Sequence, residues 1–450
     1  MSRIKVSKSP SSPEKIEENE DLLTEILLHL GAKTLIRFKC VSKVAFVFGD
    51  RTRRHGQHLL KKLSCSVVSL QTNAKRWSTI ISSPYFCHRH VFRHANITKV
   101  SSIFLESGED DDNKNRYFNN HNDIKPLSLE NGSHGSSSPF DSIEIHPKDL
   151  AYIVQSCNGL LLCRILHHHK NRAFLPIESF FVCNPTTECF NFLPDPYKAL
   201  DADSHESSPW LYMNFAFDPS TSSSAYVAIC VWKFKAVKNS SRSRFETMVY
   251  SSTDEAEPGS WRPCGSPLMA PAKFELHNGV YFNGSVHWIG FVDPDSYAKM
   301  SVSLRFDFKE LRLRDDNMPP LPDLDYFYIP AAACGHLNLV GFSSPERSNM
   351  IRVYQMAMDY SRWVLLHTLD LSPMYWPNDF IASVKVLHLI QDNEDDCSGM
   401  SLVLVVNYNV VVFRLKDYTF KRIYSRYVPW NESAESPPIS FEHIESLVQL

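Results

Sequence analysis

Two hydrophobic patterns divide the chain. Near the N-terminus, apolar residues recur three and four positions apart, which is the spacing of one face of a helix. From Ile143 onward, short runs of β-branched and aromatic residues alternate with turn residues, which is typical of strands. The pattern predicts a small helical module followed by an all-β body. The helical residues are Leu22, Leu23, Ile26, Leu27 and Leu30.

The first predicted helix carries signals for both of its ends. Asn19 is a candidate N-cap, and Glu20 and Asp21 fall in the first turn, where the helix dipole favours negative charge. His29 and Gly31 are stop signals. A module this small cannot bury all its apolar residues, so part of its surface should meet a partner or a neighbouring domain. The second predicted helix carries Leu35, Ile36, Phe38, Cys40 and Val41.

Tight turns separate the predicted strands of the body. Asn184–Thr187, Asp218–Ser220 and Asn283–Gly284 each join two apolar runs, and Pro presets φ while Gly accepts a positive φ. Leu402–Phe413 is too short to span a bilayer as a helix and is interrupted by two asparagines. We therefore expect two strands around a turn there.

One type of strand pair recurs through the body, at blade-like intervals of 67, 56, 48 and 59 residues. Repeats of this size suit a β-propeller better than a sandwich. Residues 402–425 give three closely spaced strands and are expected to form the closing blade. The predicted fold class is α + β and multidomain, with a small all-α bundle followed by an all-β, propeller-like domain. The recurring positions are Val182, Val249, Arg305, Val353 and Val412.

Several phrases resemble one known family. DLLTEILLHLGAKTLIRFKCVSK and RWSTIISSPYFCHRHVF are similar to the two halves of the F-box of plant F-box proteins. SCNGLLLC, VCNPTTECFNFLP and GVYFNGSVHWIGF resemble the F-box-associated, kelch-like domain of the same family. The predicted divisions of the chain are a disordered N-terminus over 1–15, an F-box over 16–95 interrupted at 44–75, a linker or long loop over 106–142, which is rich in Asp, Asn, Ser and Gly, and a propeller-like domain over 143–450.

The resemblance also implies a function. In this family the F-box docks on the Skp-type adaptor of a cullin-RING ubiquitin ligase, and the C-terminal domain binds a target protein for ubiquitination. Such a subunit is not an enzyme and needs no cofactor. The alternative is a ligase-independent protein-binding scaffold with a degenerate F-box, since Glu18 and Asn19 replace the usual Leu-Pro. By motif position, the adaptor contacts implied are Leu22, Leu23, Ile26, Leu27, Leu35, Cys40, Val41 and Trp77.

A 32-residue segment, Val44–Lys75, interrupts the motif. Its removal restores CVSKRWSTIISSPYF, with Trp77 at the family position. The segment is a whole number of codons, begins with Val, whose codons start GT, and ends with Lys, one of whose codons ends AG. Because introns usually begin with GT and end with AG, a retained intron or a gene-model error is one explanation for the segment. A genuine loop is the other, because loop closure costs little extra free energy as a loop lengthens.

Charge and cysteine content limit the partners, metal sites and cellular compartments that we expect. The first 105 residues are basic and the rest acidic, but part of the basic excess lies in Val44–Lys75, and we expect no nucleic-acid partner. The eleven cysteines include no CxxC pair, which argues against a zinc site. The N-terminus lacks an apolar signal-peptide core, so we expect reduced thiols, cytosol or nucleus, and no membrane association.

No catalytic fingerprint is present, so we expect neither catalytic nor metal-binding residues. Three adjacent histidines, 167–169, cannot all face one metal from a strand, and we expect an exposed loop. His287 and His336 fall in apolar hairpins and are expected to be packed. Five tryptophans at 210, 232, 261, 363 and 376 should lie in blade cores or rims, with one or two as exposed anchors. Candidate target-binding loops are 204–210 and 293–297.

Overall fold

A computed structural model of the chain forms two compact units. The helical unit comprises the described residues within 1–95, together with residues 219–224 and 445–449. The β unit comprises nearly all the rest, from Asn96 onward. The described residues are 19–39, 75–94, 100–105, 124, 126–135, 138–168, 178–199, 209–235, 240–253, 259–277, 279–292, 300–315, 318–321, 327–342, 350–371, 384–392, 399–425 and 440–450.

The helical unit contains the predicted first helix, α2 (Glu20–Leu28), and a later helix, α5 (Pro84–Arg93). Residues 32–39 and 75–82 are also helical. Proline occupies the first turn of α5 after the N-cap Ser83, whose hydroxyl accepts a hydrogen bond from the Phe86 N–H at 3.2 Å. Proline suits that position because its missing N–H has no partner within the helix.

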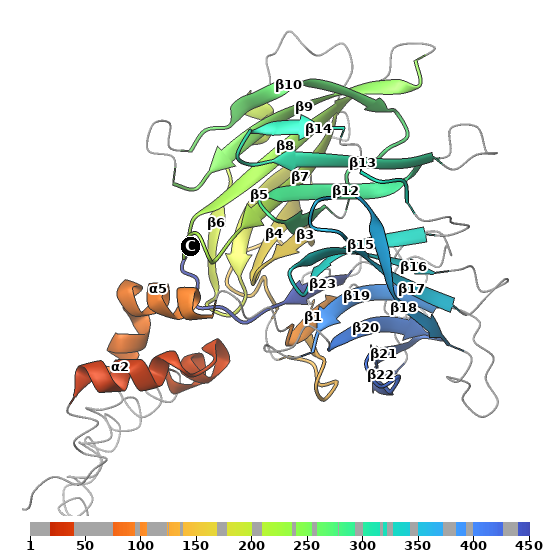
Figure 1. The fold of residues 1–450 in the computed structure, drawn as a ribbon. Coiled ribbons are helices and arrows are strands. Elements are labelled where there is room, and N and C mark those ends of the chain that lie inside the picture. Colours follow the sequence, from red (N-terminus) through yellow and green to blue (C-terminus); the bar gives the residue numbers. More distant parts are fainter. Residues whose placement is uncertain are drawn as a thin grey trace, which may run out of the picture. The chain divides into compact units, whose positions relative to one another are not determined.

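The described β unit consists of six antiparallel sheets, which confirms the predicted propeller (Figure 1). Five sheets have four consecutive strands each, and the sixth has three. The first four-stranded sheet contains β3 (Leu150–Cys157), β4 (Leu160–Leu166), β5 (Glu178–Asn184) and β6 (Cys189–Phe192). The second contains β7 (Trp210–Phe217), β8 (Tyr226–Phe234), β9 (Arg242–Ser251) and β10 (Arg262–Pro271). A short 3-10 helix, Pro196–Ala199, lies between them.

The next three sheets continue in chain order. The third contains β11 (Val280–Phe282), β12 (Ser285–Val292), β13 (Met300–Asp307) and β14 (Arg312–Arg314). The fourth contains β15 (Phe327–Ala333), β16 (His336–Phe342), β17 (Met350–Met356) and β18 (Trp363–Asp370). The fifth contains β19 (Val384–Gln391), β20 (Met400–Val406), β21 (Asn409–Arg414) and β22 (Phe420–Tyr424). Figure 1 shows these three sheets one after another as the colour changes from green-cyan to blue.

The sixth sheet closes the ring with strands from both ends of the β unit. It has the order β2 (Pro126–Ser128), β1 (Ser102–Leu105), β23 (Ser440–His443). β1 pairs with β23 over four residues, from Ser102 opposite His443 to Leu105 opposite Ser440. β23 in turn contacts β3 of the first sheet and β19 of the fifth. The ring is therefore held by backbone hydrogen bonds between residues more than 300 positions apart.

The predicted hairpins are confirmed. Asn283 and Gly284 form the two-residue turn between β11 and β12, with φ values of +46° and +69°. Leu402–Phe413 contains parts of β20 and β21 around Asn407 and Tyr408, which also have positive φ. The five recurring positions inferred from sequence each fall in the third strand of a four-stranded sheet: β5, β9, β13, β17 and β21.

Two sequence expectations differ from the observed fold. Residues 402–425 were expected to close the propeller, whereas β1, β2 and β23 form the closing sheet. The β unit also begins at Asn96, earlier than residue 143, and β2 lies inside the expected linker. Ile124 and Phe140, from the same range, are buried against Phe181 in the core of the first sheet. Both differences arise because the pairing partners lie far away in sequence, where local pattern carries no signal.

Candidate functional site

The first helix of the helical unit is capped as its sequence predicts. The Asn19 side chain accepts a hydrogen bond from the Leu22 N–H at 3.1 Å, which satisfies one donor that the helix itself leaves free. Glu20 and Asp21 occupy the first turn. His29 is the C-cap residue, and Gly31 follows before residues 32–39 continue as a helix. The capping fixes where α2 begins and ends, and so which residues share each face.

The structure divides the candidate adaptor-contact residues between the inside and outside of the helical unit. Leu23, Leu27 and Leu35 are buried. Leu22 and Ile26, one turn apart on α2, are 43% and 42% exposed. Residues at this spacing lie side by side on one face of a helix, so the two side chains form an exposed apolar patch that a partner can cover. The buried core around the three leucines also contains Leu28, Ala32, Ile80, Ile81, Phe86, Cys87 and Leu447.

Trp77 brings the two halves of the interrupted motif together. Its ring packs edge-on against Phe38, with the ring centroids 5.6 Å apart. Trp77 is partly buried against the same core as Leu35. Cys40 and Val41, the remaining two candidate contacts, lie outside the described residues, as do nearly all residues of Val44–Lys75. The helices on either side of that segment therefore pack together despite the interruption.

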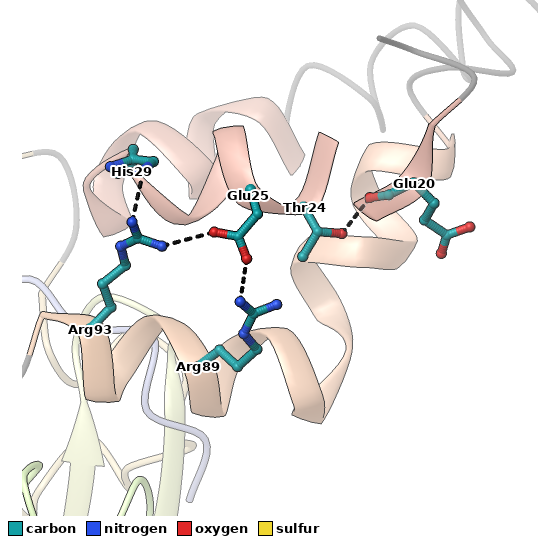
Figure 2. A network of polar contacts seen from close by, with 6 residues as sticks. All are labelled: Glu20, Thr24, Glu25, His29, Arg89 and Arg93. Carbon is teal, nitrogen blue, oxygen red and sulfur yellow. Dashed lines mark hydrogen bonds and ion pairs between the residues drawn. The ribbon is translucent and has the colours of Figure 1, made fainter. Parts of the chain in front are cut away.

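A charged network beside the exposed pair ties α2 to α5 (Figure 2). Glu25 accepts hydrogen bonds from Arg89 and from Arg93, the latter at 3.0 Å, and Arg93 also contacts His29 at 2.8 Å. The Arg89 hydrogen bond, followed by that of Arg93, lowers the pKa of the Glu25 carboxyl. Sequence reasoning missed this network because its partners are 64 and 68 residues apart. Glu25 lies between Leu22 and Ile26 in sequence, so the network borders the exposed apolar pair.

His90 of α5 and His94, the C-cap residue of that helix, form hydrogen bonds with backbone carbonyl groups at the end of α2 and just beyond it. His90 Nε2 lies 2.8 Å from the Leu30 carbonyl oxygen, and His94 Nε2 lies 3.0 Å from that of Leu28. Because a carbonyl can only accept, each Nε2 carries a proton and donates it. His90 is 3% exposed, and burial lowers its pKa to about 4. The neutral imidazole is therefore the form that fits this site.

In the β unit, one tryptophan is a candidate recognition anchor. Trp210 is 67% exposed at the start of β7, whereas Trp232 on the neighbouring strand is fully buried. Trp261 is buried and donates its indole N–H to the Pro194 carbonyl at 2.7 Å. Trp363 is partly buried, and residue 376 lies outside the described residues. Of the candidate loops, only residues 209 and 210 are described.

Two of the conspicuous histidines of the β unit, His167 and His287, are paired or packed. His167 is only one-third exposed, because its ring nitrogens contact Asp149 at 2.7 Å and Ser179 at 2.8 Å. His167 and His168 both lie in a loop, as expected, and His168 is exposed, whereas contacts to residues outside the histidine run leave His167 only partly exposed. His287 is fully buried and stacks on Tyr360, and burial lowers its pKa to about 4. Among the described residues, no group of three or more His, Cys, Asp or Glu side chains could hold a metal ion.

One known domain model matches the first part of the helical unit. The F-box domain model matches residues 19–44, and the match ends at the first residue of the interrupting segment. An F-box protein of Arabidopsis thaliana is 26% identical over 441 residues, covering 92% of this chain and 87% of that protein. A second Arabidopsis F-box protein is 24% identical over 281 residues, covering 60% of this chain and 51% of its own length. No described helix is long and apolar enough to cross a membrane.

Proposed function

We propose that this chain, an F-box protein similar to those of Arabidopsis thaliana, is the substrate-recognition subunit of an SCF-type cullin-RING ubiquitin ligase. Its F-box docks on the Skp-type adaptor, and its β-propeller binds the protein to be ubiquitinated. Holding that target near the charged conjugating enzyme raises the effective concentration of its lysines. The subunit thus contributes proximity and orientation and no catalytic group of its own. It acts in the cytosol or nucleus.

The observation that carries this proposal is the exposed pair Leu22 and Ile26 within the F-box match. The two side chains make direct contact with the adaptor. Leu23, Leu27 and Leu35 support docking indirectly, because they pack in the buried core and hold α2 in place. Cys40 and Val41 belong to the same motif, and Trp77 extends the apolar surface beside Phe38.

Target binding belongs to the β-propeller, with Trp210 as its candidate anchor. An exposed tryptophan offers a large apolar ring and one N–H donor, and this residue type is enriched among interface hot spots. Affinity purification with the proteasome inhibited, followed by mass spectrometry, should recover targets with the wild-type chain. Recovery should fall with Trp210→Ala while adaptor recovery stays constant. Equal target recovery with both chains would exclude this anchor.

The experiment for docking is co-purification with a Skp-type adaptor, carried out with and without Val44–Lys75. Removal of the segment returns Trp77 to the family position, so the shortened chain should retain more adaptor than the full chain. If neither form retains adaptor, the docking proposal fails and the ligase-independent scaffold is favoured. A proteomic search of the source tissue for the tryptic peptide VAFVFGDR, which begins the segment, tests whether the segment is translated. If the segment is an intron or a gene-model error, this peptide should be absent from the native protein, and its detection would exclude that explanation.

A further inference from the structure

Residues 445–449 follow the last strand of the propeller but belong to the helical unit. Leu447 is 1% exposed and lies in the same buried core as Leu23, Leu27 and Phe86. That core otherwise comes from residues before position 88. The F-box core is therefore completed by a side chain more than 350 residues further along the chain.

Polar contacts hold the same segment on two sides. Lys33 Nζ lies 3.2 Å from Glu445 Oε1, which ties the segment to the second helical stretch of the F-box. The Gln449 amide lies 3.9 Å from the Cys87 sulfur on α5. Leu447 is thus held between a contact to residues 32–39 and a contact to α5.

A unit this small depends on each of its buried side chains. Below about 40 residues, a single hydrophobic core rarely stabilises a fold without additional support. Leu447 supplies such support, because it is the one described residue from beyond position 95 in this buried hydrophobic core, where it packs with residues from α2 and α5. Without it, Leu23 and Leu27 would face a cavity, and the α2 face that carries Leu22 and Ile26 would lose its backing.

We propose that residues 445–449 are a positioning segment for adaptor docking, with Leu447 as the residue that completes the F-box core. This inference rests on the docking function proposed above and adds a condition to it. The F-box, although it is made first, becomes competent to dock only when the segment after β23 is in place. A chain that lacks its C-terminal segment is therefore not loaded onto the ligase, which keeps receptors without a complete target-binding domain out of the complex.

The test compares three variants of the full chain. Leu447→Asp places a charge in the core, and Leu447→Met keeps the volume and apolar character. Leu450→Asp is the matched control, because it makes the same change three positions later at a residue outside the segment. Hydrogen exchange of the amides of α2 and α5 reports the stability of the helical unit, and exchange of β20 and β21 reports the stability of the propeller. Calorimetry gives the dissociation constant for the adaptor.

Leu447→Asp should accelerate exchange in α2 and α5 by about tenfold or more, weaken adaptor binding by a similar factor, and leave β20 and β21 unchanged. Leu447→Met and Leu450→Asp should match the wild type. The inference is overturned if Leu447→Asp leaves both readouts within about twofold of the wild type, or if it accelerates β20 and β21 equally. If the wild-type chain does not bind the adaptor at all, the docking function fails, while exchange in α2 and α5 still decides whether Leu447 completes the core.

Discussion

The buried histidine His90 makes the stability of the helical unit depend on pH. Its imidazole donates to the Leu30 carbonyl and lies 4.2 Å, ring to ring, from His94. Burial lowers the pKa of His90 to about 4, while an unfolded histidine has a pKa of about 6.5. Between these values the unfolded state binds a proton that the folded state excludes. Stability contributed by the neutral ring is therefore complete above pH 6.5 and is lost as the pH falls toward 4.

The size of the effect follows from the two pKa values. Proton linkage for one such group removes about 2 kcal/mol of folding free energy between pH 7 and pH 5, and about 3 kcal/mol by pH 4. A loss of 2 kcal/mol is large beside the marginal stability of a small folded unit. The helical unit should therefore open locally in mild acid before the propeller unfolds.

The measurement must resolve the helical unit, because His287 in the propeller also has a pKa lowered to about 4 and adds an acid sensitivity of the same sign. Native-state hydrogen exchange at α2 and α5, corrected for the intrinsic rate at each pH, gives the local opening free energy from pH 7 to pH 5. His90→Gln retains a donor but no titrating ring. The matched control is His88→Gln on the exposed side of the same helix.

The wild type and His88→Gln should each lose about 2 kcal/mol of opening free energy at α2 and α5 over this range. His90→Gln should lose much less, because it has no ring that titrates in this range. If His90→Gln shows the same pH dependence as the wild type, the buried imidazole is not the group responsible.

Two further predictions concern the propeller. Gly132 and Gly284 both have φ near +68°, but an added Cβ at Gly132 would overlap the Ile423 carbonyl, whereas Gly284 faces open space. Gly284→Ala should cost about 1–2 kcal/mol in denaturant unfolding and Gly132→Ala clearly more, so equal costs would contradict the close approach. Cys163 and Cys183 are buried, and burial raises the pKa of the Cys163 thiol well above its usual value. Both thiols should resist alkylation in the native protein, and rapid labelling detected by mass spectrometry would show that the first sheet opens readily.

Local sequence patterns predicted much of this structure because many of its elements are determined locally. The N-cap at Asn19 and the turn at Asn283–Gly284 depend on the chemistry of a few adjacent residues. The propeller could be predicted because hairpins repeat along the chain. Each recurring position, such as Val353, falls in the third strand of its sheet.

The remaining features depend on contacts between distant residues. The pairing of β1 with β23, the network around Glu25 and the burial of Leu447 each join segments that local patterns cannot connect. Exposure is similarly non-local. Trp210 and Trp232 both lie in strands, but only the finished arrangement of strands exposes the first and buries the second. The four candidate adaptor residues on α2 illustrate the same limit, since helical spacing predicted one apolar face without dividing its exposed residues from its buried ones.

The most direct test of F-box docking is the dissociation constant of the full chain for a purified Skp-type adaptor, measured by calorimetry. Leu22 and Ile26 are each about two-fifths exposed, so covering both contributes about 2 kcal/mol, or about 30-fold in affinity. The double variant Leu22→Ser/Ile26→Ser should bind about 30-fold more weakly. The matched control, Val364→Ser/Leu365→Ser, changes an exposed aliphatic pair on β18 and should bind as the wild type does. Equal affinities for the two double variants, or no binding by the wild type, would contradict docking through this face of α2.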